Sequence, residues 1–168
     1  QAFLNAGLRI STKDERAGKE AYDEMCYEGG IREFVSFINA GKTPLHENVI
    51  YVSGDRAGST AEVALQWNDS YSESLVSFAN NIHTPEGGMH ETGFKAALTR
   101  ALNNYAHAKK IIKDEEGFSG DDCREGLAAV ISVKLENPQF EGQTKAKLGN
   151  SEMRTLVDNV VSERLAEF

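Results

Sequence analysis

The segment from Leu127 to Leu135 limits the possible folds of this chain more than any other part of the sequence. Apolar side chains occupy every second position in it: Leu127, Ala129, Ile131, Val133 and Leu135. Ala128 and Val130 make the first half of the segment apolar on its other face as well. Because successive side chains of a strand point to opposite faces of a sheet, both faces of this strand have to be covered. The segment therefore predicts a central, well-covered strand.

Several other segments have the composition or the period of two that is typical of strands. Residues Leu8–Asp14 and Glu20–Tyr27 flank a polar turn and predict a hairpin. Val49–Val52 and Thr60–Asn68 predict a second hairpin, and Ser74–Ala79 predicts the strand after it. Because short turns separate these last three strands, we expect them to form an antiparallel meander.

Three segments have apolar residues at the spacing of an amphipathic helix. The first begins at Ile31, after a Gly-Gly pair, and is ended by Gly41. The second runs from Glu91 to about Lys110. The third has Ser151 as its expected N-cap, and its apolar stripe continues to Phe168. Strands first in blocks and then interleaved with helices indicate the α+β class.

The bulk composition is typical of a soluble globular protein. Of the 168 residues, 40% are hydrophobic and 26% are charged, which suits one domain with a real core or two small ones. The sequence has no apolar run near the ~20 residues that a membrane-spanning helix needs and no signal peptide, so we expect a cytoplasmic protein. Cys26 and Cys123 lie far apart and predict two reduced thiols, not a zinc site. The sequence begins without Met, and we expect it to be a piece of a longer protein.

Charge is segregated along the chain, and the net charge is −8. Net acidity argues against a generic nucleic-acid coat. The stretch from Thr92 to Lys113 contains no acidic residue, and its basic residues are Lys95, Arg100, Lys109, Lys110 and Lys113. If one helix continued to Lys113, all of these lysines would share a face that could bind DNA without sequence preference. The alternative is that this face is only the solvated side of the helix; Arg100 lies off it and is expected to form a structural ion pair.

The segment Phe140–Asn150 carries the most information about function. Two glycines bracket an amide, a hydroxyl and two ammonium groups, which belong to Gln143, Thr144, Lys145 and Lys147. Such a loop can bind an anion, with lysine as a point charge and glutamine as a neutral donor. The alternative is an ordinary solvated connection. The sequence contains no GxxxxGK[ST] motif, so a P-loop is excluded.

Other noticeable residues have simpler structural explanations. His83 and His90 flank a loop with two glycines, but no combination of an acid and a nucleophile lies beside them, so we do not expect catalysis. The pair Asp121-Asp122 could suggest a metal site, although a helix start with surface ion pairs explains it better. Trp67 is expected to anchor the core.

Five long stretches resemble the transducer domain of the bacterial DNA gyrase B family, in the same order along the chain. They are YEGGIREFVSFIN (27–39), VALQWNDSYSESLVSFANNI (63–82), EGGMHETGFKAALTRALNNY (86–105), GDDCREGLAAVISVK (120–134) and PQFEGQTKAKLGN (138–150). The B subunit of topoisomerase IV has similar stretches, and the words NPQFEGQTK and QWND favour gyrase. The chain departs from the family at Met89, where Thr is usual, and at Lys95, where many members have Arg. Lysine cannot make the bidentate phosphate contact that arginine makes, so a bidentate phosphate contact is not expected from Lys95.

The resemblance implies an α+β fold like domain 2 of ribosomal protein S5. This fold has a mixed or antiparallel sheet, helices packed on one face and a long C-terminal helix. It also contains a left-handed βαβ crossover, against the usual right-handed preference. Residues 1–168 would then form a single transducer domain of a larger protein, between an upstream ATP-binding domain and a downstream TOPRIM domain.

The resemblance also implies a role in a type IIA topoisomerase, which uses ATP hydrolysis to pass one DNA duplex through another and negatively supercoils DNA. Gln143 and Lys145 would contact the γ-phosphate of ATP, and Lys145 would be catalytic. Lys95 would face DNA. The upstream domain would bind most of the ATP and the Mg²⁺, and no metal ligand is expected in this chain. The implied partners are that domain, a second gyrase B protein, gyrase A in an A2B2 complex and double-stranded DNA, with no membrane.

Two alternatives stay open. The chain could be the transducer of a topoisomerase IV B subunit, or a stand-alone S5-like module that binds nucleic acid. The second alternative predicts appreciable DNA or RNA binding with a steep salt dependence, and the net negative charge counts against it. If the chain is a transducer, we expect it to hydrolyse no ATP in isolation and to bind DNA weakly.

Overall fold

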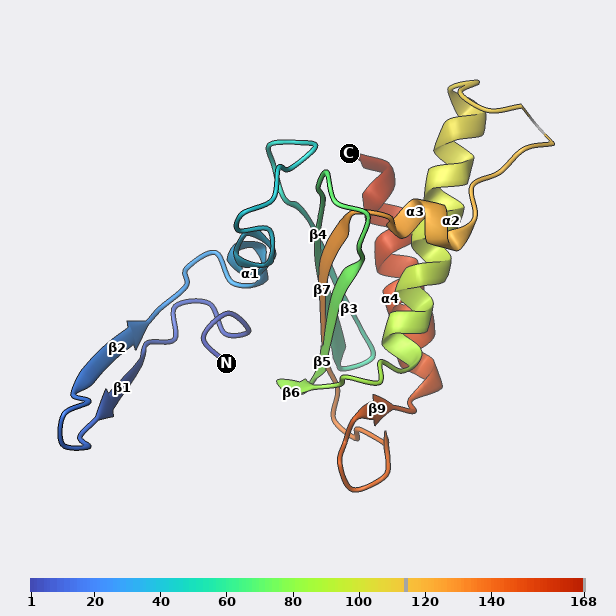
Figure 1. The fold of residues 1–168 in the computed structure, drawn as a ribbon. Coiled ribbons are helices and arrows are strands. Elements are labelled where there is room, and N and C mark those ends of the chain that lie inside the picture. The colour runs from blue at the N-terminus through green and yellow to red at the C-terminus, as the bar shows by residue number, and fades with distance from the viewer. Residues whose placement is uncertain (114, 168) are drawn as a thin grey trace.

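The computed structural model describes residues 1–113 and 115–167, which form one five-stranded sheet with helices around it (Figure 1). In spatial order, the strands of this sheet are β3 (Ile50–Arg56), β4 (Ser59–Trp67), β7 (Leu127–Lys134), β5 (Ser74–Ala79) and β6 (Ile82–His83). β7 lies in the middle, antiparallel to β4 and parallel to β5. All of its residues except Lys134 are buried, which confirms the central, well-covered strand.

The expected antiparallel meander is wrong. β3 and β4 do form the expected hairpin, and Ala57 and Gly58 have the positive φ angles that its tight turn requires. β5, however, pairs in parallel with β7, and β7 separates it from β4. The physical reason is the apolar character of β7 on both faces, which is best buried between two other strands.

Helices cover both faces of the sheet (Figure 1). α2 (Met89–Ala108) and α4 (Ser151–Arg164) pack against each other and against one face. α1 (Ile31–Ile38) packs against the other face. The expectation of helices on one face therefore holds for α2 and α4 and is wrong for α1. The reason is that β4 and β7 also carry buried apolar side chains on the second face, and α1 covers them.

The apolar stripes expected on α2 and α4 face the main core. Phe94 and Leu98 of α2 are fully buried, whereas Tyr105, one turn before the end of the helix, is exposed. α4 contributes the buried residues Met153, Leu156, Val157, Val160 and Val161. Leu165 begins a short 3-10 helix (Leu165–Glu167), and Phe168 lies outside the described residues. Within the described residues, none of the helices combines the length and the apolar character that crossing a bilayer requires.

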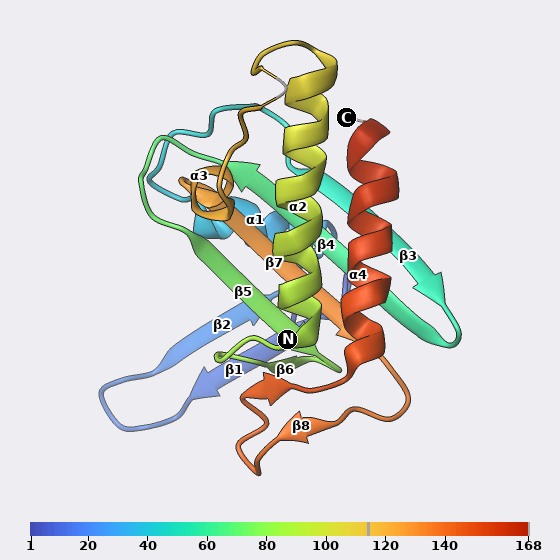
Figure 2. The same ribbon diagram turned by 90° about the vertical axis from the view of Figure 1, so that its right-hand side faces the viewer.

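The chain passes from β5 to β7 through β6, α2 and the short helix α3 (Gly120–Arg124). In Figure 2, α2 lies in front of the sheet, β5 and β7 run downward behind it, and β7 lies between β5 and β4. A crossover with this arrangement is left-handed, as the resemblance implies, whereas most such connections are right-handed. It brings the start of α2 to the end of the sheet where the segment 138–150 lies (Figure 2).

The N-terminal hairpin has the expected strands, β1 (Ile10–Asp14) and β2 (Ala21–Met25), and projects away from the sheet (Figure 1). The residues before β1 lie against the body of the molecule. There the ring of Phe3 stacks on Tyr27 and Phe34, with centroid distances of 3.7 and 4.7 Å. These aromatic contacts attach the hairpin to α1.

The start of α4 differs from the sequence expectation. Ser151 is the first residue of the helix, and Asn150 takes the N-cap position. The Asn150 side chain accepts a hydrogen bond from the Gln139 N–H at 2.6 Å and donates one to Asn137 O at 3.1 Å. Asn150 therefore holds the loop before α4 in place instead of capping the helix with its side chain.

Candidate functional site

The segment singled out by its composition forms a short hairpin at one end of the sheet (Figure 2). β8 (Phe140–Glu141) pairs with β9 (Lys147–Leu148), and residues 142–146 join them as a loop, called the tip loop below. Gln143 and Lys145 both lie in the tip loop, and both are exposed. The structure therefore presents the amide and the ammonium together to solvent.

The base of the tip loop is held against the segment that precedes α2. The Leu148 N–H donates to Gly87 O at 3.1 Å, and the Glu86 N–H donates to Ala146 O at 2.9 Å. The side chain of Leu148 is fully buried. Gly88 lies so close that a β-carbon on it would be 2.4 Å from Leu148 O. The exposed loop is thus carried by a buried, hydrogen-bonded base.

Lys145 has an unusual backbone conformation. Its φ angle of 55° lies in the left-handed region, which residues with a β-carbon rarely adopt. Its ammonium is 6.0 Å from the centroid of the Phe140 ring, and among the described residues no carboxylate forms an ion pair with it. Lys147, by contrast, pairs with Glu141 at 3.1 Å. Since backbone strain is concentrated at functional sites, Lys145 is the stronger functional candidate of the two lysines.

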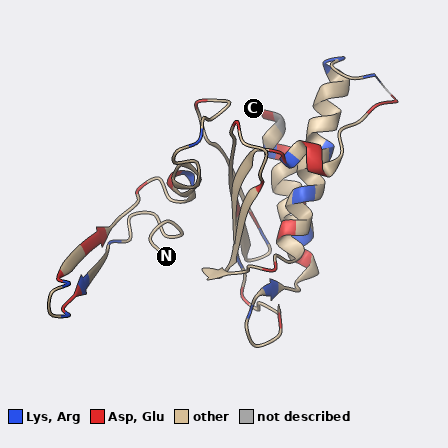
Figure 3. Ribbon diagram, in the orientation of Figure 1, with Lys and Arg blue, Asp and Glu red and all other residues tan. Residues whose placement is uncertain are grey.

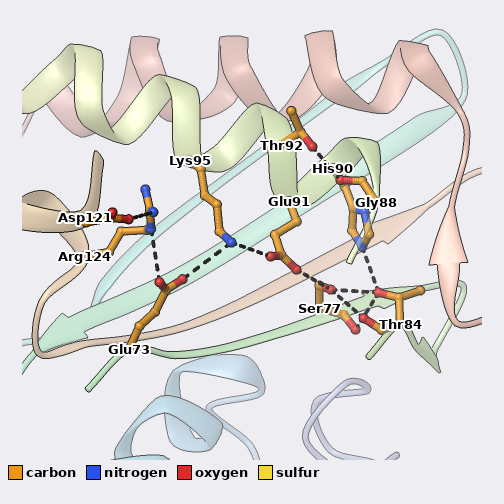
Figure 4. Close-up of polar contacts among 10 residues, drawn as sticks. All are labelled: Glu73, Ser77, Thr84, Gly88, His90, Glu91, Thr92, Lys95, Asp121 and Arg124. Atoms are coloured by element: carbon orange, nitrogen blue, oxygen red, sulfur yellow. Dashed lines mark hydrogen bonds and ion pairs between the residues drawn. The ribbon is translucent and has the colours of Figure 1, made fainter. Parts of the chain in front are cut away.

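A group of polar side chains connects β5, the segment before α2 and the first turn of α2 (Figure 4). Thr84 Oγ1 donates to Ser77 O at 2.9 Å and lies 2.7 Å from Ser77 Oγ and 3.2 Å from His90 Nε2. Ser77 Oγ also lies 3.3 Å from the Glu91 carboxylate, which is a second acceptor within reach of its single proton. Ser77, Thr84 and His90 are almost completely buried. These four residues, Ser77, Thr84, His90 and Glu91, are called the polar cluster below.

His90 is a neutral member of the polar cluster. Burial lowers its pKa to about 4, although the neighbouring Glu91 carboxylate acts in the opposite direction. A neutral imidazole that carries its proton on Nε2 can donate to Thr84 Oγ1. Its Nδ1 is buried and has no hydrogen-bond partner in the part of the chain that the structure describes.

Lys95 lies one turn after Glu91 on α2, and its ammonium is held between two carboxylates (Figure 4). Its Nζ is 2.8 Å from Glu91 Oε1 and 3.8 Å from Glu73 Oε1. Glu73 also pairs with Arg124 at 3.1 Å, and Arg124 pairs with Asp121 at 2.7 Å. A phosphate that approached Lys95 would therefore have to compete with these carboxylates for the ammonium.

The other lysines of the basic stretch do not continue the helix that carries Lys95. α2 ends at Ala108, and Lys110 has a φ angle of 56°, which turns the chain out of the helical path. The condition for one basic face, a helix that continues to Lys113, is therefore not met. Lys109, Lys110 and Lys113 are exposed around the far end of α2, away from the tip loop (Figure 3).

Three expectations about structural residues are confirmed. Arg100 forms an ion pair with Asp158 of α4 at 2.5 Å. Ser119 and Asp122 form a reciprocal capping box at the start of α3. Trp67 packs against the main core. Within residues 1–113 and 115–167, no group of three or more His, Cys, Asp or Glu side chains is placed to hold a metal ion.

The polar cluster is the part of the site that the sequence interpretation missed. Of its four residues, only His90 was a candidate, and it was considered together with His83 and not with the other three. A signal was present, because Ser77 interrupts the apolar strand Ser74–Ala79 at a position flanked by Val76 and Phe78. A hydroxyl within an apolar strand predicts a buried partner. The sequence does not show that this partner is Thr84.

The family model for DNA gyrase B matches residues 30–168 of this chain. The DNA gyrase B subunits of Streptococcus pyogenes serotype M1 and Myxococcus xanthus are both 54% identical to it over 168 residues. The corresponding protein of Enterococcus faecalis is 51% identical over the same length. Each match covers 99% of this chain, but the chain spans only 26%, 20% and 26% of these three relatives.

Solved structures share the fold described above. The 43K ATPase domain of Thermus thermophilus gyrase B, in complex with an aminocoumarin, matches with a TM-score of 0.85 and 40% identity. The topoisomerase IV ATP-binding domain of Francisella tularensis matches with a TM-score of 0.78 and 26% identity. Both matches cover 99% of this chain and 44% of the other chain. On the family match and on the identity to these relatives, the chain belongs to the DNA gyrase B family.

Proposed function

We propose that this chain is the transducer domain of a DNA gyrase B protein, and that its tip loop senses the terminal phosphate of ATP bound by the preceding domain. The observation that carries the proposal is the tip loop itself. It exposes the Gln143 amide and a Lys145 ammonium that no carboxylate of the described residues neutralises, on a base that hydrogen bonds hold in place. Family membership supports the proposal, because gyrase B and topoisomerase IV ATPase domains share this fold.

The donors of the tip loop suit a phosphate. Lys145 offers a positive charge, and Gln143 offers a neutral amide donor. An ammonium about 4 Å from a phosphate charge gains roughly 4 kcal/mol at an effective dielectric constant near 20. ADP lacks the terminal phosphate, so this attraction exists before hydrolysis and is lost when phosphate leaves. In the proposal, the preceding domain holds the Mg²⁺ that accompanies ATP.

In this proposal, Lys145 has two roles. It binds the γ-phosphate and stabilises the negative charge that develops there during hydrolysis. The preceding domain contributes the general base and most of the nucleotide contacts. Because the base of the tip loop is bonded to the start of α2, loss of the phosphate contact lets the whole domain rotate against its neighbour.

DNA and other proteins of the enzyme are the further proposed partners. As part of a gyrase B protein in the cytoplasm, the chain would act with a second copy of that protein and with gyrase A in an A2B2 complex. Lys95 is the proposed DNA contact, and binding would exchange its bonds with Glu91 and Glu73 for a phosphate. Lys95→Ala should then reduce the slope of DNA affinity against salt by about 1 on a logarithmic scale. A topoisomerase IV B subunit remains the second candidate, and supercoiling rather than decatenation by the complete enzyme would favour gyrase.

The test of the phosphate sensor compares two lysine variants in the full-length protein. Lys145→Ala should lower ATP turnover by about 100-fold or more, which is typical for loss of a preorganised charge-stabilising donor. Lys147→Ala is the matched control, because it also removes an ammonium from this hairpin. The Lys147 ammonium, unlike that of Lys145, is paired with the Glu141 carboxylate. The control substitution should change turnover by less than about twofold. Normal turnover in a folded Lys145→Ala protein would refute the proposed function.

A further inference from the structure

We infer that the polar cluster positions the tip loop for ATP turnover, and that Thr84 is its central residue. The inference rests on the proposed function, because it concerns how Gln143 and Lys145 are held. The cluster residues are positioning residues and not catalytic ones. They act on the tip loop through the backbone of residues 84–88.

A short chain of backbone hydrogen bonds leads from Thr84 to the tip loop. Thr84 O accepts from the Gly87 N–H at 2.9 Å, which closes a turn. Gly87 O in turn accepts from the Leu148 N–H at 3.1 Å. On the other side, the Glu86 N–H donates to Ala146 O at 2.9 Å. Because Ala146 and Leu148 follow Lys145 closely in the chain, the position of residues 84–88 determines where Lys145 projects.

The contact between residues 84–88 and β9 leaves the two segments little freedom to slide past each other. Gly88 and Leu148 form an isolated parallel bridge. A β-carbon on Gly88 would lie 2.4 Å from Leu148 O and 2.6 Å from Leu148 N, so the two main chains are in direct contact. A displacement of residues 84–88 is therefore passed on to β9.

Thr84 ties these residues to two larger elements (Figure 4). Its N–H and its hydroxyl both donate to Ser77 O of β5, each at 2.9 Å. Its oxygen can accept from Ser77 Oγ at 2.7 Å and from His90 Nε2 of α2 at 3.2 Å. A threonine hydroxyl has one donor and two acceptor sites, so these contacts use its full capacity. The hydrogen bonds of Thr84 therefore fix the position of the segment before α2 relative to both the sheet and the helix.

Burial alone does not explain a hydroxyl at this position. Valine has nearly the shape of threonine and would fill the same space without a polar group to satisfy. What the hydroxyl adds is direction, because hydrogen bonds fix orientation where apolar contacts tolerate sliding. Directional fixing matters at a site where an ammonium has to meet a phosphate held by another domain.

The test uses Thr84→Val in the full-length protein. We expect kcat for ATP hydrolysis to fall about tenfold, because displacing a positioning group by a fraction of an ångström is costly. KM for ATP should stay within about twofold, since the preceding domain makes most nucleotide contacts. Amide hydrogen exchange at Glu86 and Leu148 should accelerate about tenfold, while exchange in β4 and β7 stays unchanged. Thr84→Ser keeps the hydroxyl and should keep normal turnover.

Thr99→Val is the matched control. Thr99 lies on α2 and donates its hydroxyl to Lys95 O at 3.0 Å, so the substitution removes one partly buried hydrogen bond away from the tip loop. It should leave turnover unchanged. If Thr84→Val does not fold, Ser77→Ala replaces it, because it removes the other hydroxyl of the pair.

A combined variant separates this inference from the proposed function. In a background that carries both Gln143→Ala and Lys145→Ala, Thr84→Val should cause no further loss of turnover, because its effect passes through these two residues. A further loss of about tenfold in that background would overturn the inference. Normal turnover and exchange in Thr84→Val, with turnover lost in Lys145→Ala, would overturn the inference and leave the phosphate sensor intact. Normal turnover in Lys145→Ala would instead remove the proposed function, and the inference with it.

Discussion

The main chains of Gly88 and Leu148 touch: a β-carbon on Gly88 would lie 2.4 Å from the carbonyl oxygen of Leu148. Gly88 is the N-cap residue of α2, and Leu148 belongs to the strand that closes the tip loop. The start of the longest helix and the proposed phosphate sensor are therefore joined without a side chain between them. A rigid-body switch needs such a direct link, because soft contacts would absorb the movement.

Gly88→Ala should break this link. The new β-carbon would overlap the backbone of Leu148, and the φ angle of +142° is itself unfavourable for a residue with a side chain. We expect the free energy of unfolding, measured by urea denaturation, to fall by about 3 kcal/mol or more. Gly41→Ala is the control, since Gly41 has a φ of +83° but no atom within 4 Å of a new β-carbon. Its loss should be about 1 kcal/mol, and equal losses at both sites would show that the close approach is unimportant.

Gly93→Ala should separate α2 from α4. A β-carbon at Gly93 would lie 2.3 Å from Arg154 O, and a helix backbone cannot move locally to make room. We expect a loss of about 2–3 kcal/mol in unfolding free energy from overpacking. In Gly29→Ala, the new β-carbon meets only the flexible Glu33 side chain, at 2.7 Å, so this variant should stay close to wild type. A Gly93→Ala protein as stable as Gly29→Ala would contradict the tight packing of the two helices.

The elements that were predicted correctly carry their signal locally. β7 is apolar on both faces, and α2 and α4 have apolar stripes at helical spacing, so each pattern needs no knowledge of distant residues. The order of the strands was not predictable in the same way. The backbone N–H and C=O groups of β5 could form hydrogen bonds equally well with β4 or with β7. Which strand becomes its neighbour depends on the burial of β7 between two strands. Pairing is a property of the whole sheet, and the period of one segment does not encode it.

In the candidate site, too, the features that were predicted had a local sequence signal, and those without one were missed. The exposure of Gln143 and Lys145 follows from a polar loop bracketed by glycines, and the resemblance supplied their role. The left-handed backbone of Lys145 has no sequence signal, because lysine gives no preference for it. Both ion pairs of Lys95 were also missed. The pair with Glu91 had a local signal, because the two residues are four positions apart on one helix. The pair with Glu73 had none, since Glu73 lies far from Lys95 in the sequence and is brought close only by the crossover.

The buried imidazole of His90 should make stability depend on pH. Burial lowers its pKa from 6.5 to about 4, so between these values the unfolded state binds a proton that the folded state excludes. The contribution of His90 to stability is complete above about pH 6.5 and is lost as the pH falls toward 4, with a total of about 3 kcal/mol. Urea denaturation between about pH 4 and pH 7.5 measures it.

The control for this pH effect compares two histidine substitutions. His90→Gln should flatten the pH dependence of the unfolding free energy, whereas His83→Gln, at an exposed position, should leave it unchanged. Carboxylates also titrate in this range, so the difference between each variant and wild type is the relevant quantity. Parallel curves for wild type and His90→Gln would show that the buried histidine is not the group responsible.

Lys145→Gly should separate the stability of the tip loop from its activity. The φ angle of 55° at Lys145 costs a lysine about 1–2 kcal/mol, whereas glycine adopts it freely. The variant should therefore gain up to about 1 kcal/mol in unfolding free energy, less the extra entropy of glycine in the unfolded chain. ATP turnover of the full-length protein should nevertheless fall as far as in Lys145→Ala, because the ammonium is missing in both. A variant that lost stability would show that the lysine conformation is unstrained, and one that kept turnover would show that the ammonium is not needed. The expected combination, a more stable loop and a less active enzyme, is the signature of strain retained to aim one charged group.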